Sequence, residues 1–179
     1  PKVATKSSDP GIIETLTIHS NVNPSDTVSL CDGLVELTYV ESIMNDTIKV
    51  NITFIDTGAS INDKTVIEGL PLVGQEKVIL KFKDNNKNVL GDKPELVLYV
   101  NKITPALNKS QKSIVGLELV SKEYILNEKI RITKRMDGKV SDHIKTILTS
   151  NDYLKTQKKV DIEDTVNNFN FFGNNKKSL

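Results

Sequence analysis

The pattern of apolar and polar residues changes about two-thirds of the way along the chain. Before residue 121, short runs in which apolar and polar residues alternate are separated by polar stretches. The clearest run covers residues 48–54, and its apolar positions are Ile48, Val50, Ile52 and Phe54. A period of two residues places these side chains on one face, which is typical of a half-buried strand. The first two-thirds of the chain is therefore predicted to be β-structure.

Comparable runs predict further strands at residues 12–19, 34–41, 77–82, 95–101 and 113–120. In the first of these, Ile12, Leu16 and Ile18 are expected to share the buried face. The sequence Cys31-Asp-Gly33 before the second run is a turn signal. Six strands separated by turns predict a mainly β fold, a small antiparallel barrel or sandwich. Of these we expect the small antiparallel β-barrel.

After Val120 the pattern becomes mixed. Residues 121–127 are expected to form a short helix, with Ser121 as its N-cap. Alternation returns at residues 129–134 and predicts a strand, and Asp137-Gly138 predicts a turn.

The strongest helical pattern lies at residues 141–149. Ser141 is placed to cap this helix, and Asp142 favours the positive end of its dipole. The apolar stripe of the helix consists of Ile144, Ile147 and Leu148. Residues 158–163 and 168–172 are expected to pair as a final hairpin. The barrel should therefore be followed by an incomplete α+β segment.

These patterns divide the chain into three parts. Residues 1–11 are polar and predict a flexible tether, residues 12–127 the antiparallel barrel, and residues 128–179 the start of a mixed α/β domain. Because residues 174–179 end without a closing element, we interpret the sequence as a segment of a longer protein.

Composition excludes several classes of function. The net charge of +1 over 179 residues gives no basic surface for nucleic acid or an anionic membrane, and no apolar run could span a bilayer. Cys31 is the single cysteine, so intramolecular disulfides and cysteine-based metal clusters are excluded. His19 and His143 are isolated, and no metal or cofactor is expected. A sugar-binding module is disfavoured because such sites stack aromatic rings and the chain has no Trp.

One polar loop partly resembles a calcium site. Asp84, Asn86 and Asn88 have the alternate spacing of the first ligands of an EF-hand. Val89 occupies the sixth position, where the sharp turn needs Gly, and strands are predicted on both sides in place of helices. We therefore interpret the loop as the connection of a hairpin.

The sequence Asp56-Thr57-Gly58 is a candidate catalytic motif. It follows two apolar residues, as in retropepsin-like aspartic proteases, where two carboxylates share one proton. A chain with one such motif would have to act as a homodimer. The alternative is structural: the strand ends here, Asp56 forms an Asx-type turn, and Gly58 takes a positive φ. The later elements have no place in the protease fold, so we favour the turn.

Four separated segments resemble another family, the baseplate hub proteins of contractile-tailed bacteriophages. They are the strand at residues 48–56, the Gly-Leu-Pro-Leu-Val-Gly-Gln-Glu segment continuing to residue 82, the strand and helix start at 116–127, and the basic strand, glycine turn and helix at 132–148. Their order and spacing cover most of the chain after the tether.

The resemblance implies a structural, non-enzymatic role. It implies a barrel in a homotrimeric ring of the virion baseplate, which joins the tail tube protein to the central spike protein after assembly in the host cytoplasm. Under it, Pro71, Gly74 and Glu76 would shape the loop that leads into a barrel strand.

Overall fold

The computed structural model describes residues 11–58, 63–84, 86, 88–89, 95–109, 112–171 and 176–177. The chain divides into two compact units. Unit 1 consists of Pro1–Glu41 and Ile48–Val120, and unit 2 of Ser42–Thr47 and Ser121–Leu179. The predicted tether, apart from Gly11, lies outside the described residues.

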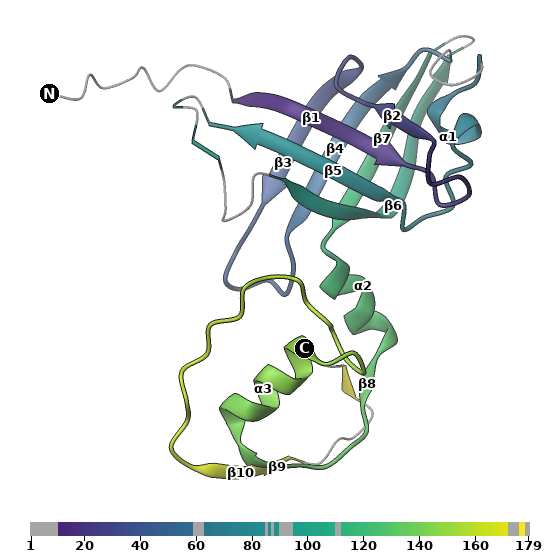
Figure 1. Ribbon diagram of the computed structural model, residues 1–179. Coiled ribbons are helices and arrows are strands. Elements are labelled where there is room, and N and C mark those ends of the chain that lie inside the picture. Colours follow the sequence, from purple (N-terminus) through teal and green to yellow (C-terminus); the bar gives the residue numbers. More distant parts are fainter. Residues whose placement is uncertain are drawn as a thin grey trace, which may run out of the picture. The chain divides into compact units, whose positions relative to one another are not determined.

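Unit 1 is built on one seven-stranded antiparallel sheet with the order β2-β1-β5-β6-β7-β4-β3. The sheet curls into a half-barrel, so that β1 and β5 cross in front of β3 and β4 (Figure 1). The prediction of a mainly β fold is confirmed. The elements of unit 1 are β1 (Ile12–His19), β2 (Thr27–Ser29), β3 (Leu34–Val40), β4 (Lys49–Asp56), α1 (Val66–Gly69), β5 (Lys77–Lys83), β6 (Leu96–Lys109) and β7 (Lys112–Val120).

The core of unit 1 lies on the inner face of this sheet. Val50, Ile52 and Phe54 of β4 are buried, and Ile48 packs beside them, as the alternation predicted. The other buried apolar residues of this cluster are Leu16, Ile18, Val28, Leu30, Val66, Leu70, Val78, Leu80, Leu98, Val100, Val115, Leu117 and Leu119. Burial of this apolar surface is the main stabilising contribution to the unit.

The prediction for Ile12 was wrong. The pairing of β1 with β5 shifts between Ile13 and Thr15, so one extra residue, Glu14, enters β1. Such a bulge changes the face on which earlier residues lie, and Ile12 is 48% exposed. The Lys83 and Lys81 ammonium groups beside Glu14 hold the pKa of its carboxyl below its usual value.

The two ends of the sheet are joined by residues 30–33. The Leu30 N–H donates to the Leu16 carbonyl at 2.8 Å, and the Ile55 N–H donates to the Gly33 carbonyl at 2.8 Å. A Cβ on Gly33 would lie 2.4 Å from the Ile55 oxygen, closer than real Cβ contacts. The predicted turn at Cys31-Asp-Gly33 is therefore present, and glycine is required at its last position.

Unit 2 contains α2 (Lys122–Lys129), β8 (Arg131–Ile132), β9 (Met136–Lys139), α3 (Val140–Thr149), β10 (Asn168–Phe171) and β11 (Lys176–Lys177). Its strands form two small antiparallel pairs, β9 with β10 and β8 with β11. The two long helices agree with the sequence patterns.

Three predictions for unit 2 were wrong. Residues 158–163 are not a strand, and β10 pairs instead with β9, whose Gly138 lies opposite Phe169. Asp137-Gly138 lies inside β9, where the positive φ of Gly138, 127°, is accommodated in the strand. Lys139, not Ser141, is the N-cap of α3. Phe172, at the end of the predicted hairpin, lies outside the described residues.

Polar contacts hold much of unit 2 together. The Ser141 N–H lies 3.3 Å from Thr165 Oγ1, and the Thr165 N–H donates to Ser141 Oγ at 3.3 Å. The Thr47 and Ser121 hydroxyls, both buried, lie 2.7 Å apart. In the part of unit 2 that the structure describes, the buried apolar residues are Ile132, Tyr153 and Leu154.

Candidate functional site

Asp56, the candidate catalytic residue, lies at the end of β4 with its side chain 1% exposed. One carboxylate oxygen accepts the Gly58 N–H at 3.1 Å, which closes an Asx turn, and the other accepts the Val66 N–H at 2.6 Å. Gly58 has φ of 77°. The Asx turn and the positive φ predicted from the sequence are both confirmed.

In this arrangement the Asp56 carboxylate accepts hydrogen bonds from two backbone amides, one in the turn and one at the start of α1. Val66 is the first residue of α1, and its N–H has no partner inside the helix. Asp56 therefore joins the end of β4 to the start of α1. The neighbouring Thr57 is exposed. In this conformation both oxygens of Asp56 are engaged by backbone donors within one chain.

Glu76 is a second buried carboxylate, and it shapes the loop before β5. Its side chain is fully buried, and Oε1 accepts the Val73 N–H at 2.6 Å and the Gly74 N–H at 2.8 Å. Gly74 has φ of 107°, and its carbonyl accepts from the Asn21 side chain. Glu76 and Gly74 thus shape this loop, and the complete burial of Glu76 was not foreseen.

The loop with EF-hand-like spacing is closed by internal hydrogen bonds. Asp84 Oδ1 accepts the N–H groups of Asn86 and Asn88, and Oδ2 accepts the Asn88 side-chain amide at 3.0 Å. These donors, the Asn88 backbone amide first, hold the pKa of Asp84 below its usual value. Across the described residues no group of three or more His, Cys, Asp or Glu side chains could hold a metal ion.

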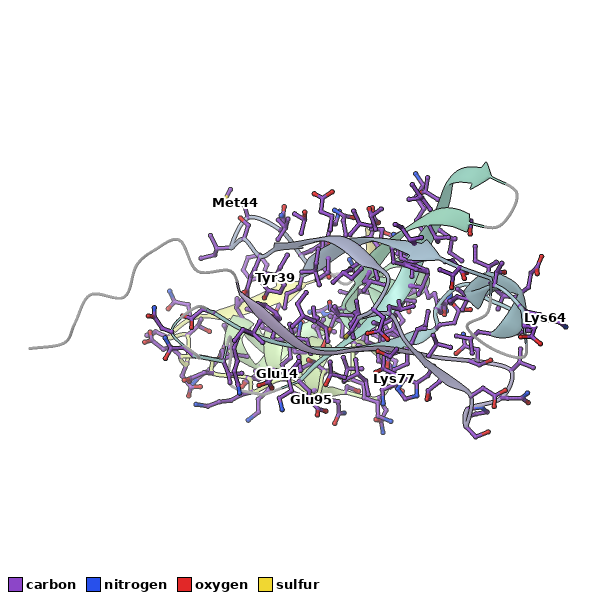
Figure 2. All side chains as sticks on the ribbon, turned by 90° about the horizontal axis from the view of Figure 1, so that it is seen from above. Glu14, Tyr39, Met44, Lys64, Lys77 and Glu95 are labelled. Atoms are coloured by element: carbon purple, nitrogen blue, oxygen red, sulfur yellow. The ribbon has the colours of Figure 1, made fainter. Side chains whose placement is uncertain are left out.

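A turn in unit 2 displays two large apolar side chains. Ile43 is fully exposed and Met44 is 87% exposed, and Figure 2 shows Met44 projecting away from the ribbon. The Asn45 N–H donates to the Ser42 carbonyl, and the Met44 N–H donates to the Ser42 hydroxyl. The turn is therefore hydrogen-bonded while its two apolar side chains are largely exposed. Two adjacent large apolar residues between Ser42 and Asn45 were the sequence signal for this feature.

Tyr39 fills the inside of the half-barrel near the open edge. Its ring lies tilted against Phe82 of β5, with 5.5 Å between the ring centroids. Its hydroxyl donates to Glu41 at 2.7 Å. Burial, and next the hydrogen bond to the Glu41 carboxylate, raise the pKa of Tyr39 above its usual value. The neutral phenol is thus the form that the fold favours.

The outer edge of β3 is a free edge at one end of the sheet. β3 is the last strand of the sheet and pairs with β4 on one side, whereas β2, at the opposite end, has three residues. Apart from its pairing with β4, the backbone from Val35 to Val40 makes no hydrogen bond to another described segment. Val35 is 59% exposed and Val40 39% exposed. Such an edge is a template for pairing with another strand.

None of the described helices is long and apolar enough to cross a membrane. No protein-family model and no curated protein sequence matches the chain.

Proposed function

We propose that this chain is a structural component of a phage tail baseplate hub. In this role, copies of the chain form a homotrimeric ring that joins the tail tube to the central spike. The proposal rests on the ordered resemblance of four segments to the hub family. It assigns no catalytic residue and no cofactor.

The fold supports this proposal through the elements on which the four segments lie. The first segment is β4, and the second runs from the end of α1 into β5. The third covers the second half of β7 and most of α2, and the fourth contains β9 and all of α3 except Thr149. In the first three segments the order of strand, loop and helix agrees with the order implied by the resemblance, and this agreement is the observation that carries the proposal. In the fourth segment the glycine lies inside β9 and not in a turn.

The distribution of exposed side chains also supports a role in assembly. Exposed apolar residues occur at the turn with Ile43 and Met44 and along β3, where they contribute nothing to the core. Exposed apolar residues and unpaired edges are typical of surfaces that bind other proteins.

The test is the mass of the full chain in solution. We expect sedimentation equilibrium and light scattering to give three copies, alone or with the tail tube and spike proteins of the same virion. Class averages from electron microscopy should show a threefold or pseudo-sixfold ring. A chain that stays monomeric at every concentration and binds neither protein would overturn the proposal.

The alternative function, a retropepsin-like homodimeric protease, would use Asp56, Thr57 and Gly58. The burial of Asp56 and the engagement of both its oxygens disfavour it, because the two carboxylates would have to meet across the dimer. Peptidase activity at acid pH that is lost in Asp56→Asn and blocked by a statine-type inhibitor would establish this function. An inactive protein that is shown to be dimeric would exclude it.

A further inference from the structure

The backbone and side chains of β3 fit a second copy of the same strand. On its inner face lie the half-buried Leu37 and Tyr39, and on its outer face the exposed Glu36, Thr38 and Val40. Residues that lie directly opposite each other in an antiparallel pair occupy the same face of the sheet. A partner strand must therefore match this order of inner and outer residues.

One self-pairing register meets this condition for every pair within residues 36–40. With Thr38 opposite its own copy, Leu37 lies opposite Tyr39 of the second copy, and Glu36 opposite Val40. Inner residues then meet inner residues and outer residues meet outer ones. An aliphatic–aromatic pair and a Thr–Thr pair are both favourable across strands.

The neighbouring registers are worse for stated reasons. With Leu37 at the centre, the half-buried Tyr39 would face Val35, which is 59% exposed. With Glu36 at the centre, two carboxylates would lie directly opposite each other, which is destabilising. The Thr38-centred register thus follows from the charges and burial of β3.

The edge also lacks the usual protection against pairing. Natural edge strands carry Lys or Pro, or are very short. β3 has seven residues, none of them Lys or Pro, and its one bulge lies at Leu34–Glu36, before the proposed contact. The segment 36–40 is therefore left regular, and Glu36 at its start is its one charged side chain.

We infer that the outer edge of β3 is a two-fold pairing site for a second copy of this chain, with Thr38 on the axis. The contact joins two seven-stranded sheets edge to edge. A few residue pairs form a small interface, so we expect a weak dimer whose formation depends on concentration. The contact is independent of the proposed threefold ring, and the two symmetries together would give six copies as two rings back to back.

The test uses charge at the two-fold axis in the full chain. Thr38→Lys places two ammonium groups opposite each other, and Thr38→Glu places two carboxylates there, so each variant alone should lose the two-fold contact in sedimentation velocity. An equimolar mixture of the two variants should regain it, because opposite charges then meet. The outward position of Thr38 leaves the folded monomer intact.

Asn51→Lys is the matched control, because Asn51 is exposed and lies opposite Thr38 on β4, one strand in from the edge. This variant should associate like the unaltered chain. Hydrogen exchange should slow at the amides of β3 as the protein concentration rises.

Several results would overturn the inference. One is association that neither Thr38 variant changes. Another is hydrogen exchange of the β3 amides that stays the same at every protein concentration. A trimer that persists in Thr38→Lys, with no dimers or hexamers in the unaltered chain, would reject the β3 contact and leave the ring. Dimers abolished by Thr38→Lys, with no trimer, would support the β3 contact and reject the ring.

Discussion

Unit 1 and unit 2 are held together by different kinds of interaction. The inner face of the half-barrel buries apolar side chains from six strands and from α1, and β3 adds half-buried ones. Unit 2 buries Ile132, Tyr153 and Leu154 and, among the described residues, relies for the rest on hydroxyl and carboxylate contacts. Each such hydrogen bond contributes about 1 kcal/mol net, less than the burial of one large apolar side chain.

This difference in packing predicts that the two units differ in stability. The apolar stripe of α3 illustrates it, because Val140 and Ile144 are exposed and Ile147 and Leu148 are only partly buried. A helix is stabilised in a protein mainly by packing of its apolar face. We therefore expect unit 2 to open locally at a lower free energy than unit 1. The following predictions test this ordering, from the largest effect to the smallest.

Phe54→Ala should have the largest effect on unit 1. Phe54 is 1% exposed in the centre of the core, and removal of a buried phenyl ring costs about 3–5 kcal/mol. Urea unfolding should show a lower midpoint, and hydrogen exchange should accelerate throughout β4 and β7. Val97→Ala is the control, because Val97 is 44% exposed on β6. Equal losses in the two variants would contradict the assignment of the core.

Leu154→Ala should have a smaller effect, about 2–3 kcal/mol, in the lower part of the range for buried leucine. The reason is that the described part of unit 2 buries only three apolar residues, so the space left by the side chain can collapse more readily than in the core of unit 1. Hydrogen exchange resolved along the chain should accelerate in α2 and α3 while the amides of β4 keep their protection. Accelerated exchange in β4 as well would contradict the division into two units of unequal stability.

Acid should weaken unit 2 through Glu123. Burial raises the pKa of this carboxyl, but the Thr156 hydroxyl at 2.6 Å and Lys158 at 3.3 Å lower it more, so the net pKa lies below the usual value. The charged form is thus favoured by folding, and this stabilisation is present above the unfolded pKa of about 4.3 and is lost as pH falls through the folded pKa.

The measurement for Glu123 is the urea midpoint of unit 2 between pH 6 and pH 3, followed by the exchange of α2 amides. Glu123→Gln should lower the midpoint at pH 6 and flatten its decline below about pH 4. Glu163→Gln alters an exposed carboxylate of the same unit and should leave the decline unchanged. Identical pH profiles for the unaltered chain and Glu123→Gln would rule out this role.

Ile43→Asp should have the smallest effect on stability, within about 0.5 kcal/mol of zero, because Ile43 is fully exposed. Thr47→Val, in the same segment, should cost about 1–3 kcal/mol, because it leaves the buried Ser121 hydroxyl without its partner. Thermal unfolding compares the two variants. A large loss in Ile43→Asp would contradict the exposure of this turn.

The sequence predicted unit 1 far better than unit 2. Strict alternation in residues 48–54 identified β4 and its buried face because period and burial agree in a one-sided strand. The same rule failed at Ile12, where the bulge at Glu14 depends on pairing with β5, a partner distant in sequence. β2 and α1 were missed because elements of three and four residues give no detectable period.

In unit 2, pairing between distant segments determines the structure. Residues 168–171 were recognised as a strand, but their partner is β9 and not residues 158–163, a choice that local patterns do not encode. Ser141 has the chemistry of an N-cap, yet it is buried and bound to Thr165 from a later segment. At the candidate site, the turn at Asp56 was foreseen, whereas its bond to Val66 depends on the position of α1.

Gly33 has a consequence for recognising distant relatives of this chain. Any side chain at this position would collide with a carbonyl oxygen of β4, and backbone cannot move aside as a flexible side chain can. Relatives whose strands have diverged beyond recognition should still keep glycine between the second and third strands. A mutational library of the chain should likewise tolerate almost no substitution there, so this one position can serve as a landmark for aligning sequences that share little else.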